Sequence, residues 1–159
     1  MKYNAPRSNT KKYRKKKMNK TPKYFDLEEF LDSSVARQKG ISNSPSWEVI
    51  EHLNELALVL DELREAWGSA INVTSGFRNR KLNNAVGGVA NSSHQYGWAA
   101  DLVPANGLFD KFVKFVKEWA KERDFDQILI ETKGKSKWLH YGHKNSLGEQ
   151  RKQFLNISK

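Results

Sequence analysis

The feature that most constrains the fold is a long helical pattern in the first half of the chain. Apolar residues recur every three or four positions over about five turns, at Ile50, Leu53, Leu56, Leu60, Leu63 and Trp67. Pro45 suits a position in the first turn of this helix, and Gly68 suits its C-terminal end. With a length of 159 residues, the pattern predicts one domain with a sizeable core.

Shorter patterns on both sides of this helix complete the expected secondary structure. Asp26 and Glu29 form a capping-box pattern, which predicts a short helix that carries Phe30 and Leu31. Residues 39–46 are rich in turn-forming residues and predict a loop.

The part of the chain that follows Gly68 contains the strand patterns and one more helical pattern. The β-branched segment 71–77 predicts a strand ending at Gly76, and residues 107–122 predict a second amphipathic helix. Segments 125–131 and 138–143 predict two strands joined by a Gly- and Lys-rich turn. Because helices come first, strands cluster late and no βαβ alternation is present, we expect an α+β fold with a small antiparallel sheet flanked by helices.

The charge of the chain is concentrated at its N-terminus. Residues 1–23 contain ten Lys and Arg and no acidic residue; removing these ten from a total of 28 leaves 18 basic against 18 acidic residues in 24–159. A block of like charge with few aliphatic residues is expected to be disordered, so we expect a basic tail at 1–23 and a folded domain at 24–159. The tail is suited to anionic polymers of the cell envelope, although a simple solubilising extension has the same composition. Nucleic-acid binding remains an alternative, but a neutral domain offers it no basic groove.

Cysteine is absent, which excludes a disulfide scaffold, a Cys-rich zinc finger and a thiol nucleophile. Any metal must therefore be bound by His and carboxylate side chains. The longest aliphatic stretch, residues 56–60, has five residues, whereas a membrane span needs about 20. No apolar region follows the basic tail as it would in a signal peptide, so we expect synthesis in the cytoplasm.

The four histidines differ in their surroundings. His52 lies beside two acidic residues and off the apolar stripe of the long helix, as an ordinary surface histidine would. His94 precedes Asp101 by seven residues, and Gly97 between them allows the chain to turn so that both side chains converge. Such a pair suits zinc, although polar residues of an ordinary loop give the same pattern.

A third ligand is expected from the last predicted hairpin. Alternation along 138–143 places His140 and His143 on opposite faces, so one of them can reach the site but not both. Glu131 ends the preceding strand. If it lies opposite His140, it places a carboxylate where it can take a proton from zinc-bound water; the alternative is a solvated residue before a turn.

These residues together resemble a known family. Ser92, His94, Gly97, Ala99 and Asp101 match the SxHxxGxAxD motif of the D-alanyl-D-alanine carboxypeptidase family of zinc peptidases, whose fold is shared by the signalling domain of sonic hedgehog. Residues 75–88 resemble the SG(F/Y)R…LN stretch of this family, and residues 138–140 resemble its WxH segment. The similarity covers about residues 24–143. Residues 24–45 and the long helix resemble the subgroup of zinc D-Ala-D-Ala carboxypeptidases, which contains many phage and bacterial cell-wall enzymes.

The resemblance implies one zinc ion, held by His94, Asp101 and His140, with a fourth position for water. It also implies that Glu131 is the general base, that Arg78 is a catalytic residue which binds substrate and polarises the scissile carbonyl, and that Ser92 hydrogen-bonds substrate. The implied substrate is a peptidoglycan stem peptide, cleaved at a D-Ala-D-Ala or an L-Ala-D-Glu bond. The implied role is that of a cell-wall lytic enzyme, either released at lysis as an endolysin or carried on a phage particle.

Two positions depart from the family pattern. Many relatives place the catalytic carboxylate three residues before the last histidine, where this chain has Lys137. Residues 125–131 instead resemble the arrangement in sonic hedgehog and in the carboxypeptidase subgroup, where a Glu at the end of a strand approaches the zinc. This resemblance implies that the base is Glu131, with Asp126 as the next carboxylate to test. The serine usually found two residues after that histidine is replaced by Gly142, which removes one hydrogen bond from the surroundings of His140. The competing interpretation is a non-catalytic zinc-binding module of the same fold, such as a structural or wall-binding virion protein.

Overall fold

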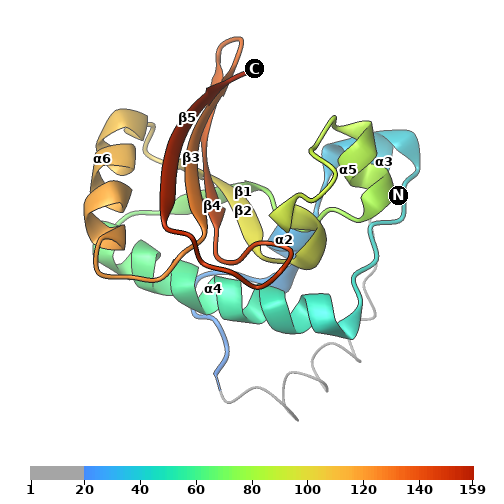
Figure 1. Ribbon diagram of the computed structural model, residues 1–159, viewed down its shortest axis with the longest axis horizontal. Coiled ribbons are helices and arrows are strands. Elements are labelled where there is room, and N and C mark those ends of the chain that lie inside the picture. Colours follow the sequence, from blue (N-terminus) through green and yellow to red (C-terminus); the bar gives the residue numbers. More distant parts are fainter. Residues whose placement is uncertain (1–19) are drawn as a thin grey trace.

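The computed structural model describes residues 20–159, so the predicted basic tail lies almost entirely outside the described residues. In chain order the elements are α2 (Leu27–Leu31), α3 (Ser34–Lys39), α4 (Trp47–Trp67), β1 (Ile71–Ser75), α5 (Arg80–Ala85), the 3₁₀ helix η1 (Ser93–Tyr96), β2 (Ala99–Pro104), α6 (Phe109–Ala120), β3 (Gln127–Lys133), β4 (Ser136–Gly142) and β5 (Gln153–Ser158). Figure 1 shows α4 running along one side of the molecule, with the strands between α6 and α5.

The five strands form one sheet in the order β1-β2-β4-β3-β5. Neighbours among the first four strands are antiparallel, whereas β5 pairs with β3 in the parallel direction. The α+β class is confirmed, and the sheet is mixed where we expected it to be wholly antiparallel. The difference is due to β5, which the sequence patterns did not predict.

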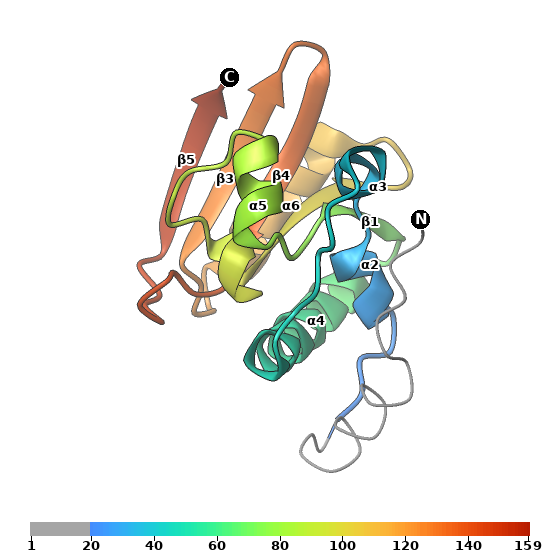
Figure 2. The same ribbon diagram turned by 90° about the vertical axis from the view of Figure 1, so that its right-hand side faces the viewer.

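The two faces of the sheet have different chemistry. Ala100, Leu102, Leu139 and Tyr141 alternate along β2 and β4 and belong to the buried core with the apolar stripe of α4 and with residues of α6. Their neighbours in sequence, including Asp101 and His140, therefore point to the opposite face. Figure 2 shows α5 on that face, with α6 behind the strands. The core thus supports a sheet whose second face is free to carry polar groups.

The caps of α4 explain why it begins and ends where it does. The Ser46 side chain accepts a hydrogen bond from the Val49 N–H at 3.2 Å, and Gly68 adopts a left-handed conformation with φ 77°. Pro45 lies just before the N-cap and not in the first turn as we expected. The backbone N–H groups of Lys23 and Tyr24 donate to the Asp61 carboxylate, which fixes the start of the folded region against α4.

Several predicted boundaries shift by one to three residues. The predicted strands at 125–131 and 138–143 are observed at Gln127–Lys133 and Ser136–Gly142, so the hairpin continues closer to its turn than expected. The capping box at Asp26 is confirmed, because its backbone N–H donates to the Glu29 carboxylate at 2.8 Å. Among the helices of residues 20–159, none is both long and apolar enough to cross a membrane.

Candidate functional site

Three buried side chains converge on the polar face of the sheet. His94 Nε2 lies 3.2 Å from Asp101 Oδ1, and His140 Nδ1 lies 3.1 Å from the same oxygen and 3.2 Å from His94 Nε2. The three atoms form a nearly equilateral triangle. Within the described part of the chain, this is the group of His and acidic residues placed to share one metal ion. The structure therefore brings together the three side chains that the resemblance named as ligands.

The fold fixes this triangle through two adjacent strands and one turn. Asp101 of β2 pairs directly with His140 of β4, which places both side chains on one face at one level of the sheet. His94 reaches them from η1, which ends at Gly97 with φ 74° before β2 begins. A Cβ at Gly97 would also lie 2.9 Å from the Val49 carbonyl oxygen of α4, so both the conformation and the close approach require glycine there.

The arrangement fits a zinc ion without rearrangement. Tetrahedral ligands about 2.0–2.1 Å from zinc lie about 3.3 Å apart, close to the three observed separations. His94 Nδ1 lies 2.7 Å from the Gly76 carbonyl oxygen, which requires a proton on Nδ1 and leaves the Nε2 lone pair for a metal. Two imidazoles and one carboxylate leave a fourth position open, as in catalytic zinc sites.

The charges of the site also favour metal binding. Burial lowers the pKa of His94 below its ordinary value, against the opposing effect of Asp101, which favours the neutral imidazole that a metal needs. Burial opposes the ionisation of Asp101, but His94 and His140 outweigh it, and together they hold the pKa of Asp101 well below its usual range. His94 therefore presents a lone pair and Asp101 a negative charge at neutral pH.

Glu131 lies on the same face but not opposite His140. The register of β3 and β4 pairs Leu129 with His140 and Glu131 with Trp138, so Glu131 is a diagonal neighbour of His140, with Cα atoms about 7–8 Å apart. Its carboxylate is buried, and Lys159 Nζ lies 3.5 Å from Oε1. The solvated alternative for Glu131 is therefore wrong. Glu131 stands beside the triangle of ligand atoms without belonging to it.

Arg78 and Ser92 border the same site. The Arg78 guanidinium donates to Ser92 Oγ at 3.4 Å, and the Arg78 backbone N–H donates to the His94 carbonyl oxygen at 3.1 Å. Burial lowers the pKa of Arg78, and the nearby carboxylates of Asp101 and Glu131 oppose this shift. Ser92 also caps η1, because its Oγ accepts from the His94 N–H at 3.3 Å. A cation and a hydroxyl are thus held against the loop that carries His94.

Three other polar residues that we named from the sequence lie outside this site. His143 Nε2 is 3.0 Å from Glu55 Oε1 on the helix side of the sheet, as the alternation along β4 predicts. Asp126 is fully buried and paired with Arg151 at 2.7 and 3.0 Å, so this carboxylate is already neutralised away from the site. Lys137 is exposed near the hairpin turn.

The comparison with protein families identifies the family of this chain. The family model described as Peptidase M15 matches residues 23–141, which is most of the chain. The chain belongs to the Peptidase M15 family. M15 peptidases are zinc-dependent, which agrees with the triangle of ligand atoms. A search of curated proteins finds no match for the chain.

Two contacts in this region could not be predicted from the sequence. The Gly76 carbonyl that orients His94 belongs to the SGFR segment, but the backbone contact gives no sequence signal. His52 does not act as an isolated surface residue, because its ring stacks on Trp98 with centroids 3.8 Å apart. A pattern along one helix could not reveal that contact, since Trp98 is distant in sequence.

Proposed function

We propose that this M15 protein is a zinc-dependent peptidase that hydrolyses a peptide bond in peptidoglycan stem peptides. The observation that carries the proposal is the triangle of His94, Asp101 and His140 beside a buried carboxylate and a guanidinium on one face of the sheet. Catalytic zinc sites typically have three protein ligands and leave the fourth position open, whereas structural zinc sites use four protein ligands.

His94 Nε2, Asp101 Oδ1 and His140 Nδ1 would hold the metal. A zinc ion bound there would supply Lewis-acid activation of water and of the scissile carbonyl. Glu131 accepts the proton of the attacking water and then delivers it to the leaving amine, a role that needs a carboxylate close to the metal but free of it. Its place outside the ligand triangle supports this division of roles.

Arg78 binds the substrate and stabilises the negative charge that develops on the carbonyl oxygen. Its guanidinium keeps its charge despite burial, because the pKa of arginine lies far above neutral pH even when it is lowered. Preorganised donors of this kind contribute strongly to acyl-transfer catalysis. Ser92 holds one end of Arg78 and offers its hydroxyl to the substrate backbone.

The cell-wall substrate rests on the resemblance to D-alanyl-D-alanine carboxypeptidases and to phage and bacterial lytic enzymes. The corresponding role is that of a lytic enzyme acting on the wall, as a free endolysin or as part of a phage particle. The basic tail would increase the local concentration of the enzyme at anionic envelope polymers. Membrane-surface attraction of about 1 kcal/mol per basic residue gives the scale of that effect.

Mass spectrometry of purified stem peptides and muropeptides incubated with the zinc-loaded protein tests the proposal. We expect one new pair of fragments whose masses identify the cleaved bond, loss of the reaction with a chelator, and its return with zinc. A protein that binds one zinc ion per chain and leaves all of these peptides intact would instead support the non-catalytic module.

A further inference from the structure

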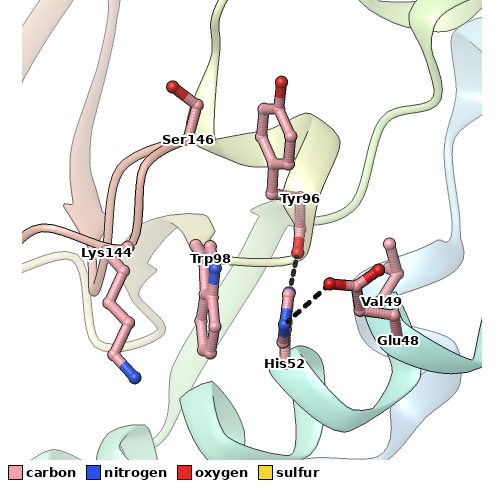
Figure 3. A pocket seen from close by; sticks show the side chains of 8 residues that line it. Glu48, Val49, His52, Tyr96, Trp98, Lys144 and Ser146 are labelled. Carbon is pink, nitrogen blue, oxygen red and sulfur yellow. Dashed lines mark hydrogen bonds and ion pairs between the residues drawn. The ribbon is translucent and has the colours of Figure 1, made fainter.

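A cavity separate from the ligand triangle lies between η1, the first half of α4 and the loop after β4. Its volume is about 420 Å³, within the range of roughly 300–1,000 Å³ of small-molecule sites. Figure 3 shows the side chains that matter here, which are Glu48, His52, Tyr96, Trp98, Lys144 and Ser146. None of them has a place in the proposed reaction.

The back of this cavity is rigid. The rings of His52 and Trp98 are stacked, 15° from parallel, and His52 Nδ1 lies 2.6 Å from the Tyr96 carbonyl oxygen. Lys144 Nζ lies 4.6 Å from the centroid of the Trp98 ring and 3.0 Å from Glu55 Oε1. Side chains held by several contacts lose little entropy when a ligand binds, so the back of this cavity is preorganised.

The cavity offers neutral hydrogen-bonding groups beside an aromatic ring. The Tyr96 hydroxyl, the Ser146 hydroxyl and the Trp98 indole N–H have no hydrogen-bond partner among residues 20–159, and the Tyr96 residue is 38% exposed. The charge of Lys144 is balanced by Glu55, and Glu48 adds a further negative charge at the rim. This lining favours a neutral, hydroxyl-rich ligand over an anionic peptide.

The position of the cavity relates it to the candidate active site. Tyr96 follows His94 by two residues on η1, and Trp98 precedes Asp101 by three residues. The His143 N–H donates to the Trp98 carbonyl oxygen at 2.7 Å, which continues the β2–β4 pairing from Asp101 toward the cavity. The Trp98 ring stacks on His52 of α4, so it lies on the α4 side of the sheet, opposite to the side chain of Asp101. The element shared by the cavity and the ligand triangle is η1, which carries both Tyr96 and His94.

We propose that this cavity binds an N-acetylhexosamine ring of the glycan to which the stem peptide is attached. The inference rests on the proposed peptidase function, since the sugar is the part of peptidoglycan that is neutral and hydroxyl-rich. Tyr96 packs its ring against the sugar, and the hydroxyls of Tyr96 and Ser146 bond its polar groups. A sugar held there anchors the attached stem peptide beside η1, the element that carries His94.

The kinetic test compares two substrates, a disaccharide-linked stem peptide and the same peptide with its sugars removed. We expect the wild-type protein to have the lower KM for the sugar-bearing substrate. Tyr96→Ala should reduce this preference about three- to tenfold, the scale of one lost aromatic contact, and Tyr96→Phe should retain most of it. Leu147→Ala, an exposed change in the same loop, is the matched control and should leave the preference unchanged. Equal losses on both substrates in Tyr96→Ala would overturn the proposal.

A binding measurement separates this inference from the proposed reaction. Titration of the protein with N,N′,N″-triacetylchitotriose, followed by NMR or by tryptophan fluorescence, needs no hydrolysis. Saturable binding that is weakened by Tyr96→Ala and by Ser146→Ala supports the sugar site even if no peptide bond is cleaved. Absence of binding, together with equal KM values for the two substrates, would refute it even if the protein is an active peptidase.

Discussion

Gly76→Ala should destabilise the protein and weaken its metal site through one added methyl group. A Cβ at position 76 would lie 2.5 Å from both the Cα and the carbonyl oxygen of Phe30, which are backbone atoms that cannot rotate away. The loop is held there by the hydrogen bond from the Phe77 N–H to the Phe30 carbonyl oxygen at 2.7 Å. Relief of the overlap must therefore move the Gly76 carbonyl, which is the hydrogen-bond partner of His94 Nδ1.

The size of both effects follows from this geometry. Overpacking of this kind costs about 1–3 kcal/mol, which lowers the Tm of a chain of this length by roughly 2–4 °C per kcal/mol. Disturbance of a partner that orients a metal-ligating histidine costs about 10–100-fold in metal affinity. Thermal unfolding of the metal-free protein and competition with a fluorescent zinc chelator measure the two quantities separately.

Gly134→Ala is the matched control for this variant. Gly134 lies in the β3–β4 turn with φ 60°, and an added Cβ there meets no atom within 4 Å. We expect a loss of stability of about 1 kcal/mol from backbone strain and unchanged zinc affinity. Unchanged zinc affinity in Gly76→Ala would refute the inference that the Gly76 carbonyl orients His94, whatever happens to the Tm.

Three further predictions concern the ligands and the core. His140→Ala should lose stoichiometric zinc while His143→Ala keeps it, as metal analysis of the two purified proteins will show; the opposite pattern would contradict the assignment of faces along β4. Tyr141→Phe should leave the free energy of unfolding unchanged or raise it by up to about 1 kcal/mol, because the hydroxyl is buried without a partner among residues 20–159; a loss above 1 kcal/mol in denaturant unfolding would reveal a hidden bond. The metal-free protein should lose stability as the pH falls below 6.5, the ordinary pKa of histidine, because the lowered pKa of His94 means that the unfolded chain binds more protons. A Tm that does not fall between pH 8 and pH 5 would contradict that direction.

The elements predicted from sequence are those whose signal is local. The apolar stripe and the Gly68 cap identify α4, and the capping box identifies α2, because each depends on residues within a few turns. Alternation along β4 separates His140 from His143 for the same reason. Strand β5 could not be predicted in this way, since its partner β3 is distant along the chain and its side chains are mostly exposed.

Glu131 lies on the expected face of the sheet, although its partner on β4 is not the residue we considered. We considered Glu131 opposite His140, but the hairpin closes at Gly134 and Lys135, which pairs Glu131 with Trp138. The difference is two residues, and side chains along a strand repeat every two residues, so the carboxylate remains on the face that carries Asp101 and His140. The tertiary contacts of Gly76 and His52, by contrast, join segments whose proximity no local pattern encodes.

Hydrolysis by Glu131→Gln, measured beside wild-type protein with equal zinc content, tests the central claim most directly. The side chain keeps its size but cannot accept a proton, so we predict one zinc per chain, an unchanged Tm within about 2 °C and a rate of muropeptide cleavage reduced by about 10²–10⁴-fold. A zinc-loaded Glu131→Gln protein that cleaves at the wild-type rate would contradict the proposed mechanism.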